Sequence, residues 1–377
     1  LWQRAADELG TQPGFAETFM PDGHAPRAGE YFKSPGHART LRLIAETKGK
    51  AFYEGVIAEE IAAFAKAHDA ALSEADLAAH RADWCGTISK SFDDVTLHEI
   101  PPNGQGIAAL MGLGILSNTG IRDIDADDPA ALHLQIEAMK LALRDAETYV
   151  ADLDHMTRVT AQDLLDDGYL AARAKEIDAT RATNFGAGAP KHGGTVYLTA
   201  ADASGMMVSF IQSNFAGFGS GVVVPGTGVA LQNRGAGFSL DPGHQNFVGP
   251  GKRPFHTIIP GFLMGPSDPV MSFGVMGGPM QAQGHVQMVL RTQLWGQDPQ
   301  MAVDAPRWRA TGGLGLACET TLPAETLGAL ASLGHALDLE EPDTAFGFGG
   351  AQLIHCLEDG GYAGGSDPRK DGAAIGF

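Results

Sequence analysis

Apolar residues recur every three or four positions along two stretches of the first half of the chain, which is the spacing of an amphipathic helix. One stretch covers residues 37–68 and is interrupted near Gly49 and Gly55. The other covers residues 129–150 and begins at Pro129, a residue favoured in the first turn of a helix. Its apolar positions on one face are Leu132, Ile136, Met139 and Leu143. The first half of the chain is therefore expected to be mainly helical.

The pattern changes after residue 194, where apolar and β-branched residues gather in short runs. Residues 195–202 and 206–213 are two such runs separated by a short Asp/Ser/Gly turn, which predicts a β-hairpin. Further strands are expected in residues 228–231, 256–264 and 270–276, and further helices in residues 283–294 and 323–333. Helices that lead into a set of strands indicate an α+β or layered α/β protein built around a sheet.

A segment of different character separates the two patterns. Residues 181–194 read RATNFGAGAPKHGG, with four glycines and a proline. Such a segment has little to pack against a core, so it predicts a mobile surface loop. The loop ends at Thr195, which is the first residue of the expected hairpin.

Composition and charge narrow the class of partner. Acidic residues number 45 against 26 basic ones, which gives a formal net charge of −19. Binding to nucleic acid or to an anionic membrane requires clustered Lys and Arg, so neither partner is expected. The three cysteines, Cys85, Cys318 and Cys356, form no CxxC pair and are expected to be buried thiols in a reducing compartment. This favours the cytoplasm, although Leu rather than Met at position 1 leaves a periplasmic location open.

Several common functional motifs are absent. The chain has no phosphate-binding GxxxxGK[ST], no GxSxG nucleophile elbow, no HExxH and no EF-hand loop. His244 and His256 lie in a Gly/Pro-rich stretch and are expected to make ordinary hydrogen bonds. No metal ion and no cofactor is therefore expected.

A Gly-rich loop that ends at a Thr opening a strand suits an N-terminal nucleophile. In such enzymes the hydroxyl attacks the preceding carbonyl and cuts the chain. The freed residue then carries both the nucleophile and an α-amino group, whose pKa of about 8 lets it act as the base. Glycine before the cut allows the strained backbone that this attack requires.

Ordered blocks over nearly the whole chain make this interpretation specific. They include residues 133–140 (HLQIEAMK), 194–202 (GTVYLTAAD), 209–214 (SFIQSN), 217–221 (GFGSG), 231–235 (LQNRG), 274–278 (GVMGG) and 365–369 (GSDPR). In this order they resemble the γ-glutamyltransferase family. The resemblance implies a four-layer αββα sandwich of the N-terminal-nucleophile type. It also implies an autoprocessing amide hydrolase or acyltransferase that acts on a small-molecule substrate, a γ-glutamyl or related carboxylate-bearing amide.

The resemblance assigns roles to individual residues. Thr195 would be the nucleophile and Gly194–Thr195 the cleavage site, with Thr199 inside the strand as the rival. Cleavage would give a mainly helical part, residues 1–194, and a catalytic part, residues 195–377. The two parts would form one domain, a processed heterodimer that itself can pair into a dimer of heterodimers.

Other positions of the family's site can also be matched. Gly277 and Gly278 would form the oxyanion hole, because adjacent small residues after a strand let two amides converge; the alternative for this pair is a plain turn. Asn214 would lie near the nucleophile and the acyl group. Either Gln212 or Ser213 would replace a Thr that hydrogen-bonds the nucleophile.

The expected γ-glutamyl pocket is altered. Gly237 stands where the family has an acid for the substrate ammonium, Arg234 replaces a nearby amide, and His256-Thr257 replace the Ser-Ser pair for the α-carboxylate. A cation in place of an anion disfavours an ammonium. We therefore expect an acyl group with a carboxylate and without the α-amino group, as in oxamate amidohydrolases and glutaryl-acylase-like members, or an acyl group that is positioned quite differently. Arg234 in a structural ion pair is the alternative.

The match also lacks a sizeable N-terminal portion of the family, which includes a first strand and an Arg that binds the substrate carboxylate. This portion is expected to be missing from the chain. The altered pocket and this gap support a rival of another class, an unprocessed binding homologue without activity.

Overall fold

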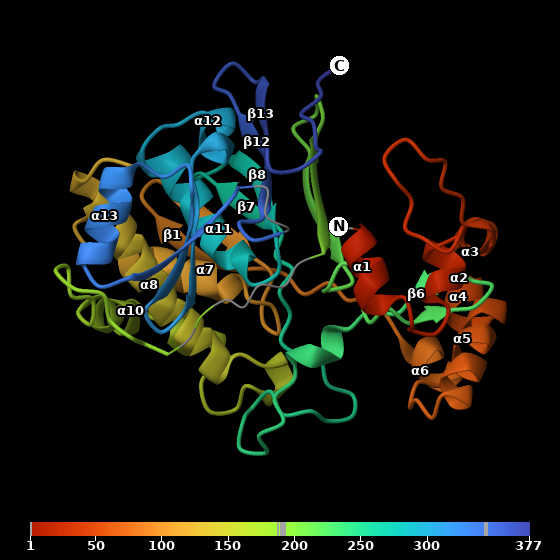
Figure 1. Ribbon diagram of the computed structural model, residues 1–377. Coiled ribbons are helices and arrows are strands. Elements are labelled where there is room, and N and C mark those ends of the chain that lie inside the picture. The colour runs from red at the N-terminus through yellow and green to blue at the C-terminus, as the bar shows by residue number, and fades with distance from the viewer. Residues whose placement is uncertain (1, 187, 189–193, 343–345) are drawn as a thin grey trace. The chain divides into compact units, whose positions relative to one another are not determined.

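The chain divides into two compact units in a computed structural model that describes all residues except 1, 187, 189–193 and 343–345 (Figure 1). Unit 1 comprises residues 1–84 and 216–233, and unit 2 comprises residues 85–215 and 234–377. The expected cleavage site therefore lies inside unit 2. The division of the chain into residues 1–194 and 195–377 stays a prediction about processing.

Unit 1 is helical with one small hairpin. Its elements are α1 (Trp2–Leu9), α2 (Phe15–Phe19), α3 (Pro35–Thr47), α4 (Lys50–Glu54), α5 (Val56–Ala67), α6 (Glu74–Ala79), β5 (Val223–Val224) and β6 (Val229–Ala230). The expected helix breaks are confirmed, because Gly49 and Gly55 are the N-terminal caps of α4 and α5. In the β5–β6 hairpin, Val223 and Val224 are each buried in a different small apolar core of this unit.

A six-stranded sheet forms the centre of unit 2. Its strands, in spatial order, are β1 (Ile88–Phe92), β2 (Val95–Glu99), β7 (Gly261–Met264), β8 (Pro269–Met276), β12 (Gly350–Cys356) and β13 (Tyr362–Ser366), each antiparallel to its neighbours. The expected strand 270–276 is confirmed as β8. The expectation for residues 256–264 is right only for the last four, and β1 and β2 were not expected.

Helices cover one face of this sheet and a hairpin covers the other. The hairpin consists of β3 (Thr195–Ala201) and β4 (Met207–Ser213), which confirms the two runs and the short turn expected from the sequence. The covering helices are α7 (Gly106–Leu116) and α11 (Met280–Val289), which continues into the π-helical turn η4 (Leu290–Leu294). The residues of β8 alternate accordingly: Val275 packs against α11, and Gly274 lies against the hairpin.

The long helix α8 (Pro129–Tyr149) packs behind α7. It is buried around most of its circumference because β9 and α13 contact its other side. The remaining elements of unit 2 are η1 (Ile121–Asp123), η2 (Leu153–His155), α9 (Ala161–Leu164), α10 (Asp167–Ala174), η3 (Arg234–Gly237), α12 (Pro299–Asp304), β9 (Trp308–Gly312), β10 (Gly315–Glu319), α13 (Ala324–Ser332) and β11 (Ala336–Glu340). Strands β9, β10 and β11 form a separate sheet.

Two local expectations need correction. Cys85 is exposed, so only Cys318 is a fully buried thiol, and burial raises its pKa to about 12. The loop expected over 181–194 begins as an anchored segment, because the Ala182 amide donates to the Leu333 carbonyl at 2.7 Å. Much of the rest of that loop lies outside the described residues. Within the described part of the chain, no helix is both long and apolar enough to cross a membrane.

Candidate active site

The hairpin lies on the sheet in a register that can be followed residue by residue. The Thr199 and Ser272 hydroxyls are hydrogen-bonded at 2.7 Å. Two residues earlier, the Tyr197 ring lies so close to Gly274 that a Cβ added there would be 2.4 Å from the ring. Strands β3 and β8 therefore run side by side in opposite directions. The hydroxyl of Thr199, the rival nucleophile, is engaged inside the strand.

The same register places Thr195 at the end of β8. Side chains on one face of a strand are two residues apart, so the next step along β3 brings Thr195 level with Met276. Gly277 and Gly278 follow directly. Thr195 is 6% exposed, which fits a side chain that points between the two strands. The register thus brings the expected nucleophile and the expected oxyanion glycines to the same edge.

The Ser213 hydroxyl joins the groups around the expected cleavage site. Ser213 lies opposite Thr195 in the hairpin ladder. Its oxygen accepts hydrogen bonds from the Thr195 hydroxyl at 3.1 Å and from the Phe215 amide at 2.9 Å. Its own proton is donated to the Gly194 carbonyl at 3.1 Å. The nucleophile and the carbonyl it would attack therefore share one hydrogen-bonding partner.

The neighbours of Ser213 point elsewhere. Gln212 is exposed on the opposite face of β4, so Ser213 is the one of the two expected candidates that contacts Thr195. Asn214 is half-buried and makes no hydrogen bond to Thr195 among the described residues. Its role beside the acyl group stays a prediction.

The two glycines have backbone conformations that other residues avoid. Gly277 has φ 138° and Gly278 has φ 61°. A Cβ on Gly277 would also come within 2.8 Å of the Gly349 Cα. Within the described residues neither N–H donates a hydrogen bond to another backbone or side-chain group. Both amides precede α11, whose N-terminal dipole favours a negative charge there.

Gln105 connects this glycine pair to the neighbouring loop. Its buried side-chain amide donates to the Gly278 carbonyl at 2.8 Å and to the Thr257 carbonyl at 2.6 Å. The backbone amide of Gln105 also donates to the His256 carbonyl at 2.8 Å, so Gln105 holds the segment that contains His256 and Thr257. Gln105 thus fixes the carbonyl side of Gly278 and leaves its amide available.

Arg234 contacts Phe215, the residue whose amide donates to Ser213. Its guanidinium carbon is 4.8 Å from the centre of the Phe215 ring, and its Nη1 donates to the Thr257 hydroxyl at 2.8 Å. Burial lowers the pKa of Arg234 to about 10, so it stays charged at neutral pH. Burial, with the nearby Arg234 charge, lowers the pKa of His256 to about 4. His256 is therefore neutral, and Arg234 supplies the positive charge of this group.

Sequence reasoning missed Phe215 and Gln105. Phe215 acts through a left-handed backbone with φ 78°, which no local residue pattern announces. Gln105 acts through partners more than 150 positions away. Its place just after Pro101 and Pro102 gave no signal of that contact.

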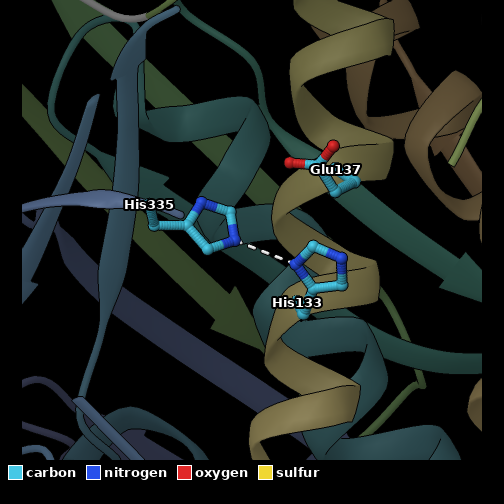
Figure 2. Close-up of side chains that lie close together, drawn as sticks. All are labelled: His133, Glu137 and His335. Carbon is cyan, nitrogen blue, oxygen red and sulfur yellow. Dashed lines mark hydrogen bonds between the residues drawn. The ribbon is translucent and has the colours of Figure 1, made fainter. Parts of the chain in front are cut away.

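A separate cluster in unit 2 has the donor set of a metal site. His133 and Glu137 on α8 and His335 before β11 are buried, and one ligand atom of each lies within 4.8 Å of the others (Figure 2). Two imidazoles and a carboxylate are suitable zinc ligands. This cluster was not expected from the sequence.

The Lys140 ammonium already occupies a position among these side chains and supplies the positive charge that Glu137 requires. It donates to Glu137 Oε1 at 2.8 Å and reaches the Thr183 carbonyl at 3.4 Å and His335 Nδ1 at 3.5 Å. Since His335 Nδ1 accepts, its Nε2 carries the proton that bridges to His133 Nδ1 at 2.9 Å. A divalent ion would have to displace a buried cation, so the residues present do not fit a metal.

Comparisons with known proteins support the family. The family model of γ-glutamyltranspeptidase matches residues 1–377. The oxamate amidohydrolase proenzyme of Klebsiella pneumoniae is 38% identical over 98% of this chain and 70% of its own length. The glutathione hydrolase-like YwrD proenzyme of Bacillus subtilis is 34% identical over the same shares. The chain belongs to the γ-glutamyltranspeptidase family.

Solved structures support the fold of this family member. The crystal structure of a cephalosporin acylase from Bacillus halodurans matches the whole chain and 70% of its own chain, with a TM-score of 0.92 and 45% identity. The expected α+β architecture of the N-terminal-nucleophile type is thereby confirmed. The chain is an amidohydrolase of this family.

Proposed function

We propose that the chain cuts itself between Gly194 and Thr195 and that the freed Thr195 is the nucleophile of an amidohydrolase. The observation that carries this proposal is the double hydrogen bond of Ser213 with the Thr195 hydroxyl and the Gly194 carbonyl. Relatives named proenzymes agree with a processed enzyme.

Processing follows from this arrangement. The Thr195 oxygen attacks the Gly194 carbonyl carbon, and the peptide bond between the two residues breaks to give an ester. Water then hydrolyses the ester and leaves a carboxylate on Gly194 and an α-amino group on Thr195. Because strands and helices from both sides of the cut form the core of unit 2, the two pieces stay together as a heterodimer. The dimer of heterodimers stays a prediction.

Catalysis uses the same hydroxyl on an external amide. The neutral α-amino group takes the Thr195 proton as the oxygen attacks the substrate carbonyl. The N–H groups of Gly277 and Gly278 stabilise the oxyanion. The leaving amine receives the proton, and water releases the acyl group from Thr195. An acceptor amine in place of water would give acyl transfer, the alternative outcome.

The acyl group is proposed to carry a carboxylate but no α-ammonium. Arg234 is buried and charged beside Phe215, close to the nucleophile's partner, and would attract the first group and repel the second. The oxamate amidohydrolase relative agrees with this class, because oxamate carries a carboxylate and no α-ammonium.

A substrate panel tests the proposal. Oxamate, glutaryl-p-nitroanilide and γ-glutamyl-p-nitroanilide are offered to the processed protein, and ammonia or p-nitroaniline release is measured. We expect kcat/KM for oxamate or the glutaryl amide to exceed that for the γ-glutamyl amide by about a hundredfold. Preference for the γ-glutamyl amide would contradict the assignment of Arg234. An uncut protein that hydrolyses none of the three would favour the unprocessed binding homologue.

A further inference from the structure

Phe215 has an unusual backbone conformation for its residue type. Its φ is 78°, in the left-handed region that a bulky side chain rarely occupies. Such strained residues cluster at functional sites, where the surrounding structure holds them in place. Phe215 follows Ser213, the hydrogen-bonding partner of Thr195, by two residues, and the roles expected from the family resemblance do not include it.

The strained backbone directs the Ser213 proton. A serine hydroxyl has one proton and two acceptor positions. The Thr195 hydroxyl and the Phe215 amide, at 3.1 Å and 2.9 Å, occupy both acceptor positions. The proton of Ser213 is therefore left for the Gly194 carbonyl, 3.1 Å away. Without the Phe215 amide, the Ser213 hydroxyl could turn away from that carbonyl.

The ring of Phe215 has a second partner. Its centre lies 4.8 Å from the guanidinium carbon of Arg234, a cation–π geometry. Arg234 is also hydrogen-bonded to the Thr257 hydroxyl, so two contacts from different segments orient its guanidinium. The backbone amide of Phe215 thus contacts Ser213 at the cleavage site, while its ring contacts the Arg234 guanidinium.

We propose that Phe215 is a positioning residue for both steps, its amide orienting Ser213 for self-cleavage and its ring holding Arg234 for the substrate carboxylate. This inference rests on the proposed function. It assigns the two effects to different parts of one residue, so they can be separated by substitution.

Two variants separate the backbone from the ring. Phe215→Asn removes the ring but keeps the amide in a residue that tolerates the left-handed region. Phe215→Val removes the ring as well, and its β-branch also resists that region, so the difference between the two variants reports the backbone effect. Lys48→Val is the matched control, because Lys48 also has a left-handed backbone, with φ 53°, and lies exposed in unit 1.

The readouts are the rate of self-cleavage and the KM of the processed enzyme for its better carboxylate amide and for the methyl ester of that amide. Phe215→Val should slow cleavage about tenfold. Phe215→Asn should cleave within about twofold of the unchanged protein and raise KM for the carboxylate amide about tenfold, with little change for the ester. Lys48→Val should leave both readouts unchanged.

The opposite pattern overturns the proposal. Equal effects of the Asn and Val variants on both readouts, or the same slowing in Lys48→Val, would show a general loss of stability. Wild-type values in both Phe215 variants would show that neither contact matters. Failure of the proposed function looks different, because the unchanged protein would then neither cut itself nor hydrolyse an amide.

Discussion

The Ser213 hydroxyl reaches Thr195 because the two residues are paired in the ladder of the β3–β4 hairpin. A shift of that pairing by one residue would put Gln212 there instead and turn the hydroxyl to the other face. The short turn of the hairpin, in which the Asp202 side chain accepts from the Ser204 amide at 2.8 Å, helps fix the register. The hydrogen bond between Ser213 and Thr195 therefore depends on the pairing of β3 with β4 in this register.

Removal of the Ser213 hydroxyl should stop most self-cleavage. In Ser213→Ala the Gly194 carbonyl loses its donor, and we expect cleavage about a hundredfold slower, the effect of one lost oxyanion donor. Ser213→Thr keeps the hydroxyl and should restore cleavage. Ser209→Ala on the same strand, which loses contacts to Tyr197 and Phe273, is the control. Gel densitometry over time gives the rates, and wild-type cleavage in Ser213→Ala would refute the role.

Gly277 should not tolerate a side chain. In Gly277→Ala the new Cβ would meet the Gly349 Cα at 2.8 Å on a backbone with φ 138°. We expect a loss of about 1–3 kcal/mol of unfolding free energy and of at least tenfold in kcat. Gly328→Ala in α13, where a Cβ meets nothing within 4 Å, should be neutral or stabilising. Urea unfolding and steady-state kinetics measure both, and full activity in Gly277→Ala would argue for a plain turn.

At the level of elements, α8 combines apolar packing with a buried ion pair. Lys140 and Glu137 are both fully buried at i, i+3, and Glu137 also accepts from the Thr183 amide at 3.0 Å. The pair therefore links the helix to the segment before the cleavage loop. Its charges cannot be solvated if one partner is lost.

Lys140→Met should be strongly destabilising, by about 3–5 kcal/mol, because it leaves a buried carboxylate without its cation. The double variant Glu137→Gln/Lys140→Met should lose much less. The exposed pair Lys50–Glu54 in α4 supplies the control, and Lys50→Met should cost less than about 1 kcal/mol. Urea denaturation gives the free energies. Equal losses in Lys140→Met and Lys50→Met would contradict the buried-pair argument.

Two buried histidines, His335 in this cluster and His256 in the candidate active site, predict a pH dependence of stability. Burial, and then the Lys140 charge, lower the pKa of His335 to about 3, and the pKa of His256 is lowered to about 4. Both histidines are neutral in the folded protein while the unfolded chain takes up protons below pH ~6.5. Their stabilisation is therefore complete above pH ~6.5 and falls as the pH drops toward 4.

His335→Gln offers both an acceptor and a donor to the cluster but does not titrate. The slope of unfolding free energy against pH reports how many more protons the unfolded chain binds than the folded protein. Between pH 6.5 and 4.5 this number should be smaller by about one in the variant, because the unfolded variant lacks one titrating histidine. Thermal or urea unfolding at several pH values measures the slope. An unchanged slope in the variant, or stability that rises on acidification, would contradict the assigned protonation states.

Over the whole molecule, the sequence predicted best those helices and strands whose apolar residues follow a clear pattern. Helix α8 and the β3–β4 hairpin lie within a residue or two of their expected bounds, because α8 carries apolar residues at helical spacing between a proline start and its end, and the hairpin has two β-prone runs around a short turn. Strands β1 and β2 were missed because each has only five residues, and β1 places Ser89, Lys90 and Ser91 among its apolar ones. Helix α11 ends in the π-helical turn η4, and no sequence pattern predicts such a turn.

The candidate site was only partly predictable for a related reason. Thr195, Gly277 and Gly278 belong to sequence blocks that resemble the family, so their positions could be read from the chain. Phe215 and Gln105 matter through a left-handed backbone and through long-range hydrogen bonds, which appear only when distant segments meet. The carboxylate preference could be inferred from Arg234 in the sequence, and the structure adds the burial of its guanidinium and its contact with the Phe215 ring.

Intact-mass analysis of the purified protein tests the assignment of Thr195 most directly. The unchanged protein should give two masses, one for the piece that ends at Gly194 and one for the piece that starts at Thr195. Thr195→Ala should remain a single chain and hydrolyse none of the amides, whereas Thr199→Ala should still be cut at Gly194–Thr195. Cleavage at another bond, or a cut between residues 194 and 195 in Thr195→Ala, would contradict the assignment of the nucleophile.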